Sequence, residues 1–187
     1  MKIPFYKPPY TGKEIEYFSN AFDTGFHNGG GEFSQKCQNL MQEKFGIGKV
    51  ILTTSGTDAL EMASLLINGR PGDEFIVPSY TFSSTVNAFM LRGMIPRFAD
   101  IDITSLNLDP KKIESLISEK TRAIVPIHYA GMPADMDDIN KLAKKYDLVV
   151  IEDAAQAVNS KYRGKFAGNL SQIGTFSFHA TKSYSCG

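Results

Sequence analysis

The sequence predicts an α/β protein, a three-layer α/β/α arrangement in which helices cover both faces of a mostly parallel sheet. Short apolar runs rich in Val, Ile and Phe alternate along the chain with segments whose apolar residues recur every three or four positions. Strands that alternate with helices in this way form parallel sheets that are buried on both faces. No internal repeat or low-complexity linker divides the 187 residues, so we expect one α/β domain.

The predicted helices share an apolar face with helical spacing, and three of them also have a recognisable start. Thr11 and Glu14 form a capping-box pattern, Asp109 precedes Pro110 at a first helical position, and Asp135 opens a strongly amphipathic segment. That last segment has acidic residues at its start and lysines near its end, which suits the helix macrodipole. Helices are expected at residues 11–22, 33–45, 56–68, 86–91, 109–117 and 135–146.

The predicted strands are short apolar runs bounded by polar or turn-forming residues. Most are rich in the β-branched and aromatic residues that fit a pleated surface. Strands are expected at residues 49–54 (KVILTT), 74–79 (EFIVPS), 95–100 (IPRFAD), 122–128 (RAIVPIH), 148–153 (LVVIED) and 174–179 (GTFSFH).

Composition excludes several classes of protein. Twenty basic residues balance twenty acidic ones without a block of like charge, so neither a nucleic-acid partner nor a membrane partner is indicated. Cys37 and Cys186 are the only cysteines and lack metal-ligand spacing, so no metal site is expected. The apolar runs are too short to span a membrane, and the N-terminus lacks the apolar core of a signal peptide. We therefore expect a cytoplasmic protein.

Ligands of open α/β sheets bind outside the carboxyl ends of the strands, and TTSGTDAL follows one such end. Gly56 lets the backbone approach a ligand, and the first amides of the following helix would suit a phosphate. The simpler alternative is that Ser55 or Thr57 only caps the helix. No lysine follows the glycine, so the stretch is not an ATP-type P-loop.

A second strand end, VVIEDAAQA, places Glu152 and Asp153 after an apolar run. A carboxylate there can cap a helix, which is the commoner case, or be a buried acid held ionised by a cationic partner. The small side chains of Ala154, Ala155 and Ala157 would leave space beside it for a flat ligand.

The third strand end, SFHATK, leads to Lys182. Most lysines are solvated and inert, but a lysine in a desolvated pocket loses its proton more easily and can attack carbonyls. Together the three strand ends offer a phosphate site, an acid for a ring nitrogen and an amine for an aldehyde, which are the needs of pyridoxal phosphate (PLP). In PSYTFSST, Tyr80 or Phe82 could stack on the ring. A nicotinamide-binding domain is not indicated, because no glycine fingerprint follows the first strand.

Six stretches carry a resemblance to a known family: SGTDAL, PSYTFSSTVNAF, FADID, IVPIHYAG, VVIEDAAQA and GTFSFHATK. In this order they resemble the DegT/DnrJ/EryC1/StrS sugar aminotransferases, which are fold-type I PLP enzymes. The resemblance implies an aspartate-aminotransferase-like large domain, a homodimer, and transfer of nitrogen from glutamate to a nucleotide-linked keto sugar. LEMASLLI, NAFMLRG and HYAGMPADMD are similar to members that convert dTDP-4-keto-6-deoxyglucose to dTDP-4-amino-4,6-dideoxygalactose for surface polysaccharides such as lipopolysaccharide and enterobacterial common antigen.

Carried over by position, the family pattern implies roles for eight residues. Lys182 would bond covalently to PLP and act as the acid–base group, Asp153 would face the pyridine nitrogen, and Gln156 would lie near the 3′-oxygen. Phe82 would stack on the ring. The phosphate would be held by Gly56, Thr57, the amide of Asp58, and Ser177. For His128 and His179 a supporting or core role is favoured over catalysis, and the role of Tyr184 stays open.

Two further features of the resemblance shape the expected function. HATK retains the lysine where sugar dehydratases of this fold carry histidine, so transamination is preferred. The sequence stops before the glycine-rich segment and the small domain of the family. Residues 1–187 are therefore expected to form the N-terminal part of the PLP-binding large domain, with the C-terminal small domain absent. The alternatives are a 3-keto-sugar aminotransferase of the same family and an inactive truncated protein.

Overall fold

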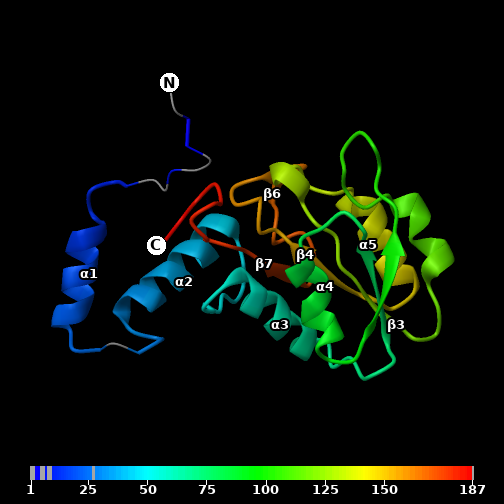
Figure 1. The fold of residues 1–187 in the computed structure, drawn as a ribbon, viewed down its shortest axis with the longest axis horizontal. Coiled ribbons are helices and arrows are strands. Elements are labelled where there is room, and N and C mark those ends of the chain that lie inside the picture. Colours follow the sequence, from blue (N-terminus) through cyan, green and yellow to red (C-terminus); the bar gives the residue numbers. More distant parts are fainter. Residues whose placement is uncertain (1–2, 5–6, 8–9, 27, 187) are drawn as a thin grey trace.

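The computed structural model describes residues 3–4, 7, 10–26 and 28–186, and it has the predicted α/β architecture (Figure 1). The central sheet has five parallel strands in the order β2-β1-β3-β4-β7. Their bounds are Glu74–Pro78 for β1, Ile95–Ala99 for β2, Thr121–Ile124 for β3, Val149–Asp153 for β4 and Ile173–Thr175 for β7. The carboxyl ends of all five strands therefore lie along one edge.

Helices cover both faces of this sheet, which confirms the predicted three layers. Helices α3 (Gly56–Leu66) and α4 (Ser83–Met90) pack on one face, against Phe75 and Ile151 among others. Helix α5 (Met136–Lys145) covers the other face, against Ile76 and Val150 among others. Neighbouring strand residues thus enter opposite cores, because successive side chains of a strand point to opposite faces.

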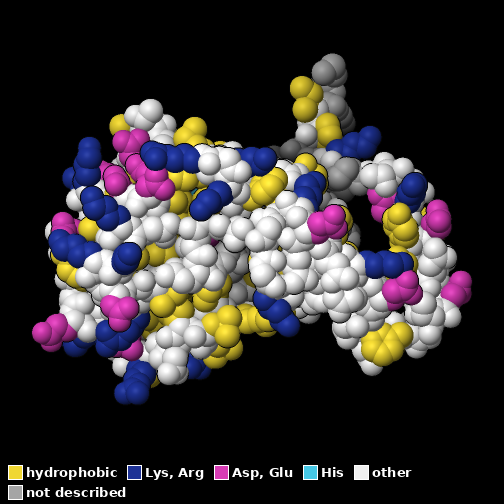
Figure 2. Space-filling model, turned by 180° about the vertical axis from the view of Figure 1, so that it is seen from behind, with side chains coloured by type: hydrophobic (Ala, Val, Ile, Leu, Met, Phe, Trp, Pro, Cys, Tyr) yellow, Lys and Arg dark blue, Asp and Glu magenta, His cyan; other side chains and the backbone are white. Residues whose placement is uncertain are grey.

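Two helices precede this unit in the chain. Helix α2 (Glu32–Phe45) attaches through Phe45, whose ring stacks on Phe176 with a centroid distance of 5.6 Å and meets Phe166 edge-on at 5.2 Å. Helix α1 (Glu14–Asp23) has no buried residue and stands apart from the sheet (Figures 1 and 2).

The Thr11–Glu14 pattern makes half of the expected capping box. The Glu14 carboxylate accepts hydrogen bonds from the Thr11 backbone N–H at 2.8 Å and from the Gly12 N–H at 2.9 Å. The Thr11 N–H is the main reason that the pKa of Glu14 falls to about 2. Helix α1 nevertheless begins at Glu14 itself, so Thr11 is not its cap residue.

Residues 49–54 do not form the predicted strand. Ile51 and Leu52 are 52% and 40% exposed, and within the described part of the chain no strand lies alongside them. Apolar, β-prone composition is insufficient here, because a strand exists only where a neighbouring backbone completes its hydrogen bonds.

Two other strands are shorter or placed differently than predicted. β3 ends at Ile124, since Pro126 has no N–H to continue the ladder and only an isolated bridge joins Ile127 to Asp153. β7 is shifted toward the N-terminus of its predicted range. Beyond it the chain turns back on itself, because the Phe178 carbonyl accepts the Cys186 N–H at 3.2 Å.

The predicted helix at residues 109–117 is wrong in type. Two 3₁₀ turns, η1 (Pro110–Lys112) and η2 (Glu114–Leu116), flank the fully buried Ile113. The chain is already extended at Ile117, so the segment is too short to nucleate an α-helix. Asp109 caps η1 by accepting the Lys111 N–H at 3.0 Å, as predicted.

The structure also contains a small hairpin that was not predicted, formed by β5 (Lys161–Tyr162) and β6 (Lys165–Phe166). Arg163 and Gly164 join the two strands, and both have positive φ, the conformation of a two-residue type I′ turn. Tyr162 donates its hydroxyl to the Asp135 carboxylate at 2.7 Å, so Asp135 precedes α5 without capping it through its side chain.

Basic and acidic side chains are interspersed on the face shown in Figure 2, without a large surface of one sign. No helix in the described ranges is long and apolar enough to cross a bilayer.

The core of the α3–α4 layer gives a direct stability test. Phe89 is fully buried and stacks on Phe75 at 4.8 Å, so Phe89→Ala is expected to lower the free energy of unfolding by about 3–5 kcal/mol. Leu91 lies two residues further along the chain but is 72% exposed. Leu91→Ala should therefore change the free energy of unfolding by less than about 0.5 kcal/mol. Urea denaturation measures both. Equal losses in the two variants would contradict the assigned core.

Candidate active site

The candidate residues gather at the carboxyl edge of the sheet. Asp153 ends β4, Ser177 follows β7, and Phe82 follows β1. The turn before α3 reaches the same edge, because Gly56 packs directly against Ser177. In the described residues no group of His, Cys, Asp and Glu side chains could hold a metal ion.

The turn before α3 presents backbone amides. Ser55 is the N-cap, since its Oγ accepts the Asp58 N–H at 3.1 Å. The backbone N–H of Asp58 therefore already has a hydrogen-bond partner. The Asp58 carboxylate accepts a hydrogen bond from the Thr54 hydroxyl, which lowers the pKa of Asp58. Among the described contacts the amides of Gly56 and Thr57 have no partner. Two free donors at the positive end of a helix can bind a phosphate.

Gly56 is required by packing as well as by access. A Cβ at this position would lie 2.9 Å from the Ser177 Cβ and 3.2 Å from its Oγ. Ser177 is itself buried, with 7% of its surface exposed. The close approach places a hydroxyl beside the free amides of the turn, so the structure brings Gly56, Thr57 and Ser177 together.

Asp153 is held in place by α4. Its Oδ2 accepts the Thr85 hydroxyl at 2.7 Å, and its Oδ1 accepts the Ala155 N–H at 3.1 Å. Thr85 is fully buried, and its hydroxyl accepts a hydrogen bond from the Thr81 hydroxyl at 2.9 Å. An ionised carboxylate has about four acceptor positions, so Asp153 can still accept a ring N–H. These two hydrogen bonds were not predicted from the sequence, although Thr81 and Thr85 lie four residues apart in PSYTFSST, which is helical spacing.

Gln156 is oriented by a backbone amide. Its Oε1 accepts the Ala130 N–H at 2.8 Å, so the amide NH₂ is the group left to donate to a ligand oxygen. Two of the three small residues near Asp153 have a different role from the one expected, whereas Ala155 is half-buried. Ala154 and Ala157 are fully buried in a cluster with Ala167, so they fill the core and do not line an open space.

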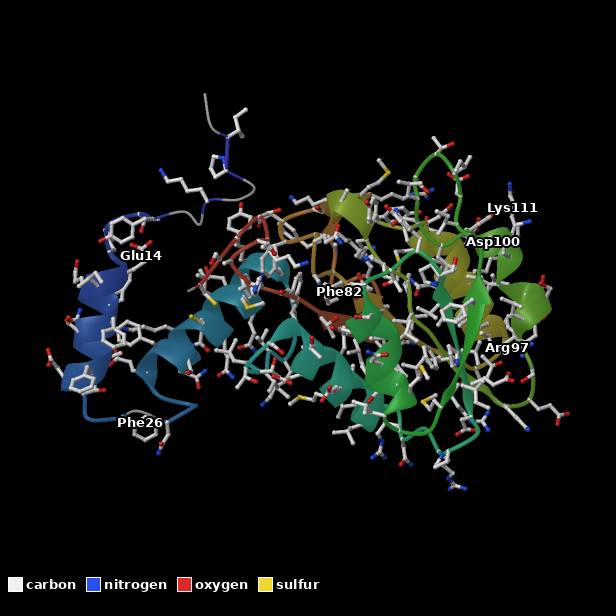
Figure 3. All side chains as sticks on the ribbon, viewed as in Figure 1. Glu14, Phe26, Phe82, Arg97, Asp100 and Lys111 are labelled. Atoms are coloured by element: carbon white, nitrogen blue, oxygen red, sulfur yellow. The ribbon has the colours of Figure 1, made fainter. Side chains whose placement is uncertain are left out.

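Two aromatic residues follow β1, and they differ in their contacts and in their exposure. Tyr80 shares a 2.8 Å hydrogen bond between hydroxyls with Tyr129, which follows β3, and this bond raises the pKa of Tyr80. Phe82 stands at the N-cap of α4 with 72% of its surface exposed (Figure 3). Phe82 is therefore the more exposed of the two aromatic side chains that could stack on a ligand ring, since Tyr80 is 44% exposed.

Lys182 lies in the turn after β7, half-buried. Its N–H donates to the His179 carbonyl at 2.9 Å, and Nζ makes no hydrogen bond or ion pair within the described ranges. The Tyr184 hydroxyl accepts the Asn159 Nδ2–H at 2.6 Å, which ties this turn to the chain that follows Asp153. The His179 ring bonds to Thr181 at 3.0 Å, and the His179 backbone N–H donates to the Ser177 Oγ at 3.4 Å.

The chain belongs to the DegT/DnrJ/EryC1/StrS aminotransferase family, whose model matches residues 9–187. It is 40% identical to a GDP-perosamine synthase from Escherichia coli O157:H7 over 99% of this chain and 51% of that protein. It is 38% identical to a GDP-perosamine synthase from Caulobacter vibrioides, over 97% and 49% of the two chains. The chain spans about half the length of the curated relatives it matches.

Solved structures agree on the fold. The candidate sugar aminotransferase Spr1654 from Streptococcus pneumoniae, in its PLP form, superposes with a TM-score of 0.92 at 27% identity. The match covers 99% of this chain and 51% of that one. The same protein was also solved in its PMP form. The predicted family and fold are thus confirmed, and the cofactor of this fold is pyridoxal phosphate.

The contact between Gly56 and Ser177 is open to a double-mutant test. Gly56→Ala is expected to lower the free energy of unfolding by about 1–3 kcal/mol, because its methyl group overlaps Ser177. In a Ser177→Gly background most of that loss should disappear. Gly48→Ala is the matched control, since a Cβ there meets no atom within 4 Å. Additive losses in the double variant would contradict the contact.

Proposed function

We propose that this protein catalyses PLP-dependent transfer of nitrogen from glutamate to a nucleotide-linked 4-keto-6-deoxy sugar. The observation that carries the proposal is the convergence of complementary groups at one sheet edge. Free amides and a buried hydroxyl suit a phosphate, a held carboxylate suits a pyridine nitrogen, and an unpaired lysine suits an aldehyde. Family membership supports the same reading.

Each residue would contribute one function. Gly56, Thr57 and Ser177 would anchor the phosphate, and Phe82 would cover one face of the ring. Asp153, fixed by Thr85, would keep the ring nitrogen protonated, and the NH₂ of Gln156 would donate to the 3′-oxygen.

Bound PLP supplies an electron sink for the carbanion that forms at a substrate carbon. Lys182 would hold the cofactor covalently in the resting protein. When not bonded to the cofactor, the Lys182 amine would act as the acid–base group that takes the proton from the Cα of glutamate. Glutamate would leave as 2-oxoglutarate before the keto sugar enters, and the sugar would leave with the amino group in place of its carbonyl oxygen, which is a ping-pong order.

The names of the two curated relatives are relevant to the nucleotide that the sugar substrate carries. The sequence motifs predicted a dTDP-linked sugar, but both curated relatives described above are named for a GDP-linked product. We therefore favour the GDP-linked 4-keto sugar as substrate and keep the dTDP-linked sugar as the alternative. Amination of a 3-keto sugar is a second alternative within the family.

Several wider expectations remain predictions. These are assignment of residues 1–187 to the N-terminal part of the large domain, a homodimer, a cytoplasmic location, and a role in polysaccharide assembly.

Lys182→Ala tests the cofactor assignment. The variant is expected to lose the visible absorption band that the wild-type protein gains on addition of PLP, because the band depends on the covalent bond to the lysine. Lys141→Ala removes an exposed lysine of α5 and should keep the band. An unchanged spectrum in Lys182→Ala would overturn the assignment.

Product analysis tests the substrate. The protein expressed from its complete gene, given glutamate and either the GDP-linked or the dTDP-linked 4-keto-6-deoxy sugar, is expected to aminate the GDP-linked sugar at C4. Mass spectrometry and NMR of the product identify both the nucleotide and the aminated carbon. Preference for the dTDP-linked sugar would support the alternative nucleotide, and an amine at C3 would contradict the proposed position.

A further inference from the structure

A second acid lies next to Asp153 on β4 and is not used by the proposed reaction. Glu152 and His128 form a pair with their side chains completely buried, and Oε2 of Glu152 lies 2.9 Å from Nε2 of His128. Glu152 points into the α5 side of the sheet, whereas Asp153 points toward α4. The pair thus lies beneath the cofactor site, on the opposite face of the same strand.

Every acceptor position of Glu152 is filled. Oε1 accepts the Leu170 N–H at 2.7 Å and the Ser171 hydroxyl at 2.9 Å. Oε2 accepts the Gly168 N–H at 2.7 Å in addition to the His128 ring. Four donors surround one carboxylate, which is the arrangement that allows a charge to be buried.

The same bonds define the state of the imidazole. Nδ1 of His128 accepts the Ala134 N–H at 3.1 Å, so this nitrogen carries no proton. Nε2 must then be the protonated nitrogen, and it donates to Glu152. His128 is therefore neutral in one tautomer, and the pair is a carboxylate hydrogen-bonded to a neutral ring.

The loop held by Glu152 in turn supports β7. A Cβ on Gly174 of β7 would lie 2.2 Å from the Gly168 carbonyl oxygen, so loop and strand are in direct contact. Phe176 is equally close, since a Cβ on Gly168 would meet its ring at 2.2 Å. Ser177 follows at once and packs on Gly56. The position of the predicted phosphate site thus depends on a loop that Glu152 fixes.

The pair also acts on Asp153 through the backbone. The His128 N–H donates to the Asp153 carbonyl at 3.1 Å, and the Thr175 hydroxyl donates to the Glu152 carbonyl at 3.1 Å. The carboxyl ends of β3, β4 and β7 are therefore joined around Glu152 by side-chain and backbone bonds together.

We propose that Glu152 and His128 are positioning residues of the cofactor site, which hold Asp153 and Ser177 at the separation that spans PLP from its ring nitrogen to its phosphate. This inference rests on the proposed function, because it presupposes that PLP is the ligand. The pair touches neither cofactor nor substrate, and its effect reaches them through the loop 168–171 and β7.

Glu152→Gln tests this role in the protein expressed from its complete gene. The variant keeps the shape but turns an NH₂ group toward N–H donors, which should shift the loop and raise the dissociation constant of PLP by about 10–100-fold. The position of the visible band of bound PLP should change as well. Glu114→Gln is the control, since Glu114 bonds to Lys145 and Tyr146 on the surface, away from this edge. The control should bind PLP with the wild-type constant.

Ser171→Ala provides a milder variant in case Glu152→Gln does not fold. It removes one of the four donors and is expected to weaken PLP binding by a smaller factor. Wild-type affinity and an unchanged band in every folded variant at these two positions would overturn the proposal. So would ¹⁵N NMR showing an imidazolium or a protonated Nδ1 at His128. If wild-type protein and Glu114→Gln form no band with PLP, the proposed function itself fails, which separates the two outcomes.

Discussion

The burial of the Glu152 carboxylate is the constraint on which the carboxyl edge of the sheet depends. A buried charge that loses a partner typically destabilises a protein by about 3–5 kcal/mol, a large part of the stability of an ordinary domain. Its partners come from the segment that follows β3 and from the loop before β7. The segments that supply these partners must therefore pack around β4 in one arrangement. This arrangement brings Ser177 and the Lys182 turn to the edge where Asp153 lies.

The alternation of a single strand separates two acids that the sequence presents together. Glu152 enters the α5 layer and is saturated by donors from its own chain. Asp153 enters the α4 layer, where Thr85 and one backbone amide leave acceptor positions free. One acid thus serves the packing of the domain and the other is available to a ligand. This division follows from the strand period of two, and the five-residue strand fixes it without any special loop.

Sequence patterns were sufficient for the elements that depend on local composition. The fold class, α2, α3, α5 and the strands at 74–78 and 149–153 follow from apolar periodicity and turn residues. The failures concern features that depend on distant partners. Residues 49–54 have strand composition but no neighbouring strand in the described chain, and Ile113 is buried by 3₁₀ turns where a helix was expected.

The site shows the same limit. The motifs identify Asp153, Gly56 and Lys182 as residue types that suit the chemistry. They do not reveal that Thr85 holds Asp153 or that Ser177 is the reason Gly56 lacks a side chain. Both contacts join residues that lie far apart in the sequence, so only the folded chain brings them together. His128 illustrates the opposite case, since its expected supporting role agrees with its complete burial beside Glu152.

We propose that Lys182 forms the covalent bond to PLP at this edge. Borohydride reduction of the PLP-loaded protein makes such a bond permanent, and mass spectrometry of its peptides locates the modified lysine. We expect one modified residue, Lys182, in the peptide that contains the SFHATK sequence. Modification of another lysine in its place, or recovery of Lys182 unmodified from protein that shows the visible band, would contradict it.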